Sequence, residues 1–270
     1  IRDFCLSRGL GDVYKRQFTM SKNKYEIDMC NGTIMDKLIS FSVPLMLSGI
    51  LQLMFNAVDI IVVGRFAGSQ SLAAVGSTTA LINMFVNLFI GVSLGANVLA
   101  ARFYASGKHK EMSETVHTAI TFAAISGVVM ALIGVLMAKP ALELMGTPDD
   151  VINLSTLYMR IYFLGMPFFM LYNYGAAVLR AVGDTKRPLM FLIAAGIINA
   201  CLNMVLVIVF NLGVAGVAIA TIFSQFISCV LVLRCLNKTD ASYQLRFSKL
   251  KIKGCLLYTS PSPRDRQKSR

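Results

Sequence analysis

The sequence has few charged residues and few residues that could carry enzyme chemistry. Asp, Glu, Lys and Arg together make up 15% of its 270 residues, while hydrophobic residues make up 56%, far from the balance of a soluble protein. Only two histidines are present, His109 and His117, and the six cysteines show no metal-binding or redox spacing. The sequence therefore does not predict an enzyme, and no catalytic residue, metal site or cofactor is expected.

Acidic residues are the scarcer charged group. The chain contains 14 Asp and Glu against 26 Lys and Arg, which gives a formal net charge of +12. A basic balance of this size could serve nucleic-acid binding, but the positive charges stand between long apolar runs and form no continuous patch. We therefore expect a lipid bilayer, and no nucleic acid, as the surroundings of this chain.

Long apolar stretches are what the sequence has in abundance. Each reaches the ~20 residues that a helix needs to cross a hydrocarbon core of ~30 Å. Helices are predicted because lipid cannot satisfy free backbone N–H and C=O groups, and the sequence shows no strand alternation. The fold class is therefore all-α, a polytopic membrane protein with six transmembrane helices. They are expected at about 38–63, 72–101, 116–137, 151–179, 189–210 and 214–236.

Basic residues gather in alternate connections between these stretches. Connections rich in Lys and Arg stay in the cytoplasm, which predicts a multi-pass protein of the cytoplasmic (inner) membrane with a cytoplasmic amino terminus. The opposite side has only Arg65 and Lys139, with Arg160 expected inside a span. The residues expected on the cytoplasmic side are Lys22, Lys24, Lys37, Arg102, Lys108, Lys110, Arg180, Lys186, Arg187, Arg234, Lys238, Arg246, Lys249, Lys251 and Lys253.

The segment after the sixth stretch, residues 237–254, alternates basic and apolar residues. Such a pattern suits a linker that lies along the inner membrane surface and leads to more protein. An ordinary basic cytoplasmic loop would have the same composition. The sequence leaves both interpretations open.

Both ends of the chain read like translated sequencing adaptor. Residues 7–16, SRGLGDVYKR, and residues 256–265, LLYTSPSPRD, correspond to opposite strands of one adaptor sequence. Additions of this kind are excluded from reasoning about the fold. We therefore expect residues 1–17 and 255–270 to be artefact tails, Met20 to be the native start, and residues 20–254 to be the transmembrane part.

A single acid, Asp59, lies within a predicted span. Burying a charge there costs at least about 2.5–3.5 kcal/mol, so an ionisable residue inside the membrane is a functional candidate. Gln52, Asn56 and Asp59 are spaced i, i+4 and i+7, which places them on one helix face. A carboxylate flanked by amides could bind a proton or a small cation. Alternatively, Asp59 lies at the outer membrane interface and is exposed to water.

Two further spans carry amide pairs. Asn199 and Asn203 are one helical turn apart in the fifth span, and Asn83 and Asn87 are one turn apart in the second. Hydrogen bonds between helices would explain such amides and contribute about 0.6 kcal/mol each within membranes. For Asn83 and Asn87 we favour that interpretation.

The second span also contains a G-x-S-x-G motif, Gly91-Val92-Ser93-Leu94-Gly95. In a hydrolase this motif needs a strand–turn–helix context and a histidine partner, and here it lies inside an apolar helix. The same two glycines form a G-x-x-x-G pattern, which predicts a close-packing helix face.

Three segments together resemble the multidrug and toxic compound extrusion (MATE) transporters. They occur in the family's order and at compatible spacing, and the resemblance covers residues 20–254. The first combines Val58-Asp59-Ile60-Ile61-Val62-Val63-Gly64-Arg65 with Leu72-Ala73-Ala74-Val75-Gly76, the second is Arg180-Ala181-Val182-Gly183-Asp184-Thr185-Lys186-Arg187-Pro188, and the third is Gly213-Val214-Ala215-Gly216-Val217-Ala218-Ile219-Ala220-Thr221.

This resemblance implies a fold of twelve helices in two six-helix lobes around a central cavity, a transporter plan of parallel repeats. The chain resembles the amino-terminal lobe only, so the missing carboxy-terminal lobe is an implied partner. The resemblance further implies alternating-access antiport, in which a small-molecule organic cation or other amphiphile leaves as protons or sodium ions enter.

The resemblance also implies a cation-coupling site. Asp59 matches the first-span acid of the family, Asn199 the fifth-span amide and Thr221 the sixth-span hydroxyl, and Asn173 corresponds to a fourth-span amide. Where some members carry a second acid, this chain has Asn203, which leaves Asp59 as the carboxylate of the implied site.

A lipid-linked oligosaccharide flippase of the same superfamily is the alternative function. Such a protein would place several cationic residues in its cavity to hold a pyrophosphate group. Here only Arg160 is a candidate, which favours export of drugs or metabolites.

Overall fold

The computed structural model describes residues 34–239 and 243–245. The described part is helical throughout, without a strand, so the predicted all-α class is confirmed. The elements are α2 (Ile34–Val62), the π-helical turn η1 (Val63–Ala67), α3 (Ser69–Ala105), α4 (His109–Leu144), α5 (Ile152–Leu164), α6 (Met166–Ala181), α7 (Lys186–Met204), the π-helical turn η2 (Val205–Val209) and α8 (Gly213–Lys238). The expected tails, 1–17 and 255–270, and Met20 lie outside the described residues.

Within residues 34–239, five helical segments are long and apolar enough to cross a membrane, and a bent pair forms a sixth span. The pair is α5 and α6, which the sequence predicted as one span over 151–179. It bends by 46° at Gly165. Pro167 stands two residues further on, and because proline lacks an N–H and its ring clashes with the preceding turn, a continuous helix is interrupted there. Each of the other expected spans lies within a single helix, extended at one end by a π-turn in two cases.

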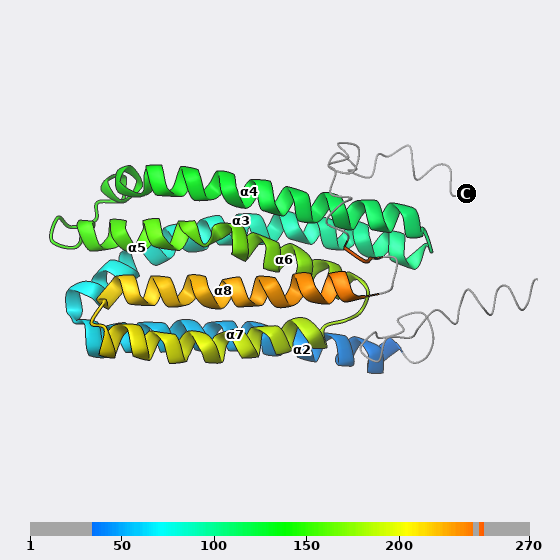
Figure 1. Cartoon of the computed structure of the whole chain (residues 1–270), viewed down its shortest axis with the longest axis horizontal. Helices are drawn as coiled ribbons and strands as arrows, with labels where there is room; N and C mark the ends of the chain where they lie inside the picture. The colour runs from blue at the N-terminus through cyan, green and yellow to red at the C-terminus, as the bar shows by residue number, and fades with distance from the viewer. Residues whose placement is uncertain (1–33, 240–242, 246–270) are drawn as a thin grey trace, which may run out of the picture.

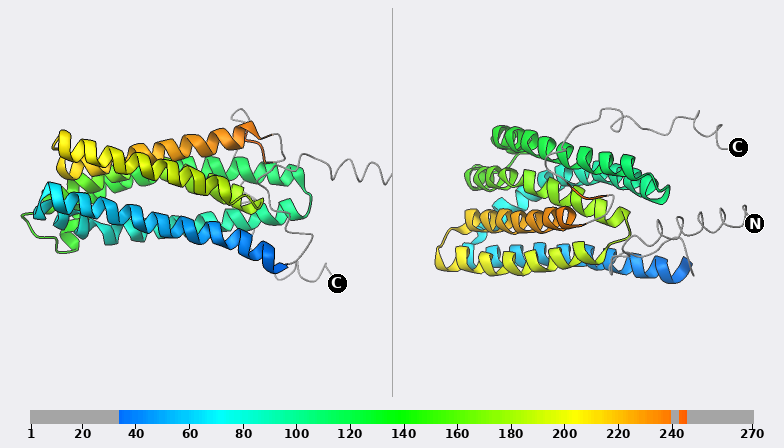
Figure 2. Two further views of the ribbon diagram at one scale, coloured as in Figure 1. Left: turned by 90° about the horizontal axis from the view of Figure 1, so that it is seen from below. Right: turned by 45° about the vertical axis from the view of Figure 1, so that its right-hand side comes forward.

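The helices run side by side along the long axis of the molecule, as both further views agree (Figures 1 and 2). α2 packs against α7, α4 packs against α5 and α6, and α8 contacts α5, α6 and α7. The turns between α3 and α4 and between α6 and α7 lie at the same end as the last residue of α8 (Figure 1). Because Lys108, Lys186 and Lys238 belong to these segments, we call this end the basic end.

Glycines allow close approach of helices, and two of these glycines lie on α4. A Cβ on Gly127 of α4 would stand 2.6 Å from Cα of Pro167, and one on Gly134 would stand 2.1 Å from the ring of Phe163. Both distances are shorter than a van der Waals contact, so these positions admit only glycine with the present backbone. α4 therefore holds the bent α5–α6 pair on both sides of its bend.

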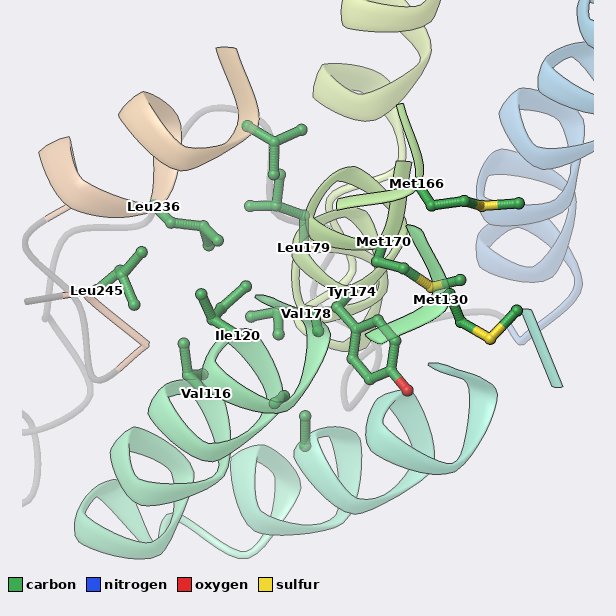
Figure 3. Packing of buried hydrophobic residues seen from close by; sticks show 14 of the residues in the cluster. Val116, Ile120, Met130, Met166, Met170, Tyr174, Val178, Leu179, Leu236 and Leu245 are labelled. Atoms are coloured by element: carbon green, nitrogen blue, oxygen red, sulfur yellow. The ribbon is translucent and has the colours of Figure 1, made fainter. Parts of the chain in front are cut away.

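Two groups of buried side chains fill the bundle. The larger group joins α4, α6 and the final turns of α8, and Figure 3 shows part of it around Tyr174 and Leu179. The smaller group surrounds η1 and η2 and includes Val63 and Val207. Large apolar side chains such as Leu53 and Leu136 are exposed on the outside of the bundle, as expected for a surface that faces lipid.

Candidate cation-binding site

Four polar side chains form a continuous hydrogen-bonded cluster between α2, α7 and α8. The amide of Asn203 donates to Oδ1 of Asp59 and to Oδ1 of Asn199, the latter at 3.2 Å. The amide of Asn199 donates in turn to Oγ1 of Thr221 at 3.4 Å. The Thr221 hydroxyl donates to the backbone carbonyl of Val217 at 2.9 Å. We call Asp59, Asn199, Asn203 and Thr221 the Asp59 cluster.

Helical periodicity brings these groups to one place. Asn199 and Asn203 are four residues apart, so both side chains leave the same face of α7. A π-helical turn follows each half of the cluster: η1 begins four residues after Asp59, and η2 begins two residues after Asn203. The two turns pack against each other.

The two amides of the cluster are buried, and one of them has an unused acceptor. Asn203 is 0% exposed and Asn199 is 6% exposed, while Asp59 is half-buried. The Oδ1 atom of Asn203 has no hydrogen-bond partner among the residues that the structure describes. A buried polar atom without a partner is rare and calls for an explanation such as a bound ion or water.

The chemistry of the cluster suits a small hard cation or a proton. Carboxylate, amide carbonyl and hydroxyl oxygens are the donors that hard cations prefer. The carboxylate of Asp59, the carbonyl oxygens of Asn199 and Asn203, and the hydroxyl of Thr221 would hold such an ion. The same carboxylate can alternatively accept a proton.

Two tyrosines of α5 lie near the cluster, and no sequence pattern predicted them as site residues. Tyr158 and Tyr162 both lie close enough to Asp59 to interact with it electrostatically. Their ring centroids are 6.2 Å apart. Tyr162 also shares a side-chain hydrogen bond with Gln225 of α8. Tyrosines are common in apolar spans, so the sequence does not single these two out. Their proximity to Asp59 follows from the packing of α5 against α3 and α8.

The structure does not bring all expected site residues together. Asn173 lies on α6, beyond the bend, and its amide donates to the carbonyl of Phe169 in its own helix at 2.8 Å. Gln52 and Asn56 are exposed on α2 and form a polar strip outside the buried cluster. Gln52, Asn56 and Asp59 share one face of α2, as expected from their spacing. Asp59 is half-buried, however, whereas Gln52 and Asn56 are exposed.

The amides and glycines of the second span also differ from expectation. Asn83 and Asn87 are exposed on α3. A Cβ added to Gly91 or Gly95 would meet nothing within 4 Å. No helix in the described part of the chain packs on this face, so the predicted close packing is not made within this lobe.

The fold is thus a lobe of membrane-length helices with a polar cluster between three of them. The MatE family profile matches residues 44–205, and the chain belongs to this family. The resemblance drawn from the sequence is thereby confirmed.

Relatives and solved structures agree with this assignment. The chain is 36% identical over 213 residues to "Probable multidrug resistance protein YoeA" of Bacillus subtilis, covering 77% of this chain and 46% of that protein. It is 28% identical to a "FAD transporter" of Shewanella oneidensis, covering 72% of this chain and 44% of that one. The structure of an outward-facing multidrug resistance MATE transporter superposes with a TM-score of 0.80 at 21% identity, covering 88% of this chain and 52% of the other. The chain thus spans about half the length of the proteins it matches.

Proposed function

We propose that this chain forms the amino-terminal lobe of a cation-coupled antiporter. The complete protein would export organic cations, drugs or related amphiphiles across the cytoplasmic membrane by alternating access, in exchange for protons or sodium ions. Relatives named as a probable multidrug resistance protein in B. subtilis and as a multidrug export protein in Staphylococcus saprophyticus support this substrate class. The second, carboxy-terminal lobe would supply the other wall of the pathway.

The observation that carries the proposal is the contact between Asp59 and Asn203. Transport against a gradient needs a group whose cation occupancy differs between two conformations, because a ligand shifts an equilibrium only through differential affinity. The Asn203 amide on α7 donates to Asp59 and to Asn199 of the same helix. Asn199 in turn donates to Thr221 of α8. A cation that enters this cluster changes the bonding between three helices, so its binding can favour one arrangement of them.

The position of Arg160 supports export of amphiphiles over the flippase alternative. A pyrophosphate headgroup needs several cationic side chains at membrane depth, whereas Arg160 is a single exposed residue of α5. Most other Lys and Arg residues of the described helices lie towards the basic end. We propose that the basic end faces the cytoplasm, as the positive-inside rule predicts.

Transport by the complete protein tests this proposal. The chain, joined to its own carboxy-terminal half, would be produced in cells that lack major efflux pumps, and efflux of ethidium would be followed by fluorescence. We expect efflux that follows an imposed proton or sodium gradient and stops when an ionophore collapses that gradient. Efflux that persists without either gradient and requires ATP would contradict the proposal.

A further inference from the structure

The chain returns to the lobe after α8 instead of leaving it. The backbone N–H of Leu245 donates to the carbonyl of Leu236 at 3.1 Å, and the side-chain amide of Gln244 donates to the carbonyl of Asn237 at 3.2 Å. Tyr243 and Leu245 are both 0% exposed and belong to the larger core group. Figure 3 places Leu245 beside Leu236, on the side of the core where Val116 and Ile120 lie. We call residues 243–245 the return segment.

A buried ion pair lies where α6 turns into α7, next to this segment. Gly183, with a φ of +85°, makes the turn that brings Asp184 to the start of α7. Oδ1 of Asp184 accepts the backbone N–H of Arg187 at 3.1 Å, which caps the helix, and Oδ2 pairs with Nε of Arg187 at 3.2 Å. The Asp184 side chain is 0% exposed and that of Arg187 is 18% exposed.

Arg187 connects this pair to α8 and to the return segment. Its Nη1 donates to Sγ of Cys235 at 3.5 Å. Tyr243 lies close enough to Arg187 to interact with it electrostatically. One guanidinium therefore contacts a carboxylate from the α6–α7 turn and a thiol from α8, and Tyr243 of the return segment adds to its electrostatic surroundings. We call Asp184, Arg187 and Cys235 the Asp184 junction.

The Asp184–Arg187 pair is buried, so we expect it to contribute more to stability than a surface ion pair would. Exposed salt bridges contribute little, but removing one partner of a buried pair leaves an uncompensated charge and is strongly destabilising. By comparison, the Lys139–Glu143 pair spans 3.8 Å with both side chains more than half exposed. Any change at Arg187 will therefore act on the segments that it contacts, whereas a change at Lys139 will not.

We propose that the Asp184 junction and the adjoining core are a docking site for the return segment. This docking fixes the point at which the chain leaves the lobe, at the basic end. Of residues 237–254, for which a linker along the membrane surface and an ordinary cytoplasmic loop were both left open, the structure describes 237–239 and 243–245, and both interpretations stay predictions. In the complete transporter the connection to the second lobe would start from this fixed point, a consequence that rests on the function proposed above.

Thiol labelling of the chain in membranes tests the docking itself. With all six cysteines of the chain replaced by serine, which leaves a hydroxyl at position 235 to accept from Arg187, single cysteines would be introduced as Leu245→Cys and, for an accessible reference, Asn237→Cys. Freeze-thawed vesicles expose both membrane faces to a charged maleimide, so the result does not depend on topology. Because labelling requires an accessible thiol, we expect the Leu245→Cys variant to react at least ~10-fold more slowly than the Asn237→Cys variant. Adding Arg187→Gln should remove most of this difference, and adding Lys139→Gln should not.

Each outcome of the labelling decides one part of the proposal. Equal labelling of the Leu245→Cys and Asn237→Cys variants would overturn the docking. Protection that Arg187→Gln leaves unchanged would overturn the role of the Asp184 junction. A second measurement guards against disturbance by the introduced thiol: a Leu236→Cys/Leu245→Cys pair should form an intramolecular disulfide on mild oxidation, and Arg187→Gln should slow its formation. Failure of this disulfide to form would also overturn the docking.

Efflux by the complete protein tests the consequence for transport. We expect Arg187→Gln to lower gradient-driven efflux several-fold at matched protein level, and Lys139→Gln to leave it unchanged. If Arg187→Gln frees the return segment but leaves efflux unchanged, the docking has no role in transport. The docking itself would still stand. If the unaltered complete protein shows no coupled efflux, the proposed function fails, and the labelling still decides the docking.

Discussion

The side-chain amide of Asn203 donates a hydrogen bond to the carboxylate of Asp59, although the two residues are 144 positions apart in the sequence. This bond joins the first span to the fifth and orients the one acid of the Asp59 cluster. Asn203 also holds Asn199, so a single amide bridges the carboxylate and the rest of the cluster. Asn203, which stands where some family members carry a second acid, thus lies at the centre of the Asp59 cluster.

Asp59→Asn should abolish gradient-driven efflux by the complete protein while its amount in the membrane stays the same. Asparagine keeps the shape and the hydrogen-bonding capacity of the side chain but cannot carry the charge that binds a cation. Efflux of a fluorescent organic cation under imposed proton or sodium gradients measures the effect. Asp36→Asn, which removes an exposed acid at the other end of α2, is the matched control and should have no effect. Full coupled efflux by the Asp59→Asn variant would remove the coupling role of this residue.

Asn203→Ala should reduce gradient-driven efflux by about tenfold or more. The amide donates to a charged group, and such hydrogen bonds contribute about 1.5–3 kcal/mol, where 1.4 kcal/mol corresponds to a factor of ten. If Asn203 only packed helices together, its replacement would cause a small loss of efflux. Asn87→Ala removes an exposed amide of α3 and should leave efflux within twofold of the unaltered protein. Similar efflux by the two variants would show that the bond to Asp59 is unimportant for coupling.

Gly127→Ala should destabilise the lobe, because the added methyl group would stand 2.6 Å from the backbone of Pro167. Overpacking of this kind costs about 1–3 kcal/mol. For a protein of this size, each kcal/mol lowers Tm by about 2–4 °C. Thermal unfolding of the chain in detergent measures the shift. Gly95→Ala, where a Cβ meets open space, should not lower Tm, and equal values for both variants would refute the close approach of α4 to the bend.

The chain by itself should insert into membranes but should not export drugs. One lobe supplies half of a pathway, and exposed polar side chains such as Gln52 and Asn56 would then face lipid. Ethidium efflux from cells producing only these residues would contradict this expectation. A chain trimmed to residues 20–254 should insert to the same extent, because neither expected tail contains a span. Loss of insertion on trimming, measured by carbonate-resistant membrane fractionation, would show that the tails are part of the native protein.

The number and type of spans could be predicted from the sequence because bilayer insertion is governed by local composition. A run of about 20 apolar residues must be helical wherever it lies in the chain, since lipid offers its backbone no other hydrogen-bond partners. The same local logic singled out Asp59, and the matched motifs added Asn199 and Thr221. Local signals did not reveal the bend at Gly165, because glycine and proline also occur in unbroken membrane helices.

What only the tertiary structure decided is which polar residues meet. Asn199 and Asn173 are both amides in apolar spans, yet one lies in the Asp59 cluster and the other bonds to its own helix. The exposed Gln52 and the buried Asn203 likewise look alike in sequence. Spacing along one helix determines which residues share a face. Which face is buried, and against which residues, depends on how separate helices pack, and that packing rests on contacts between residues far apart in the chain.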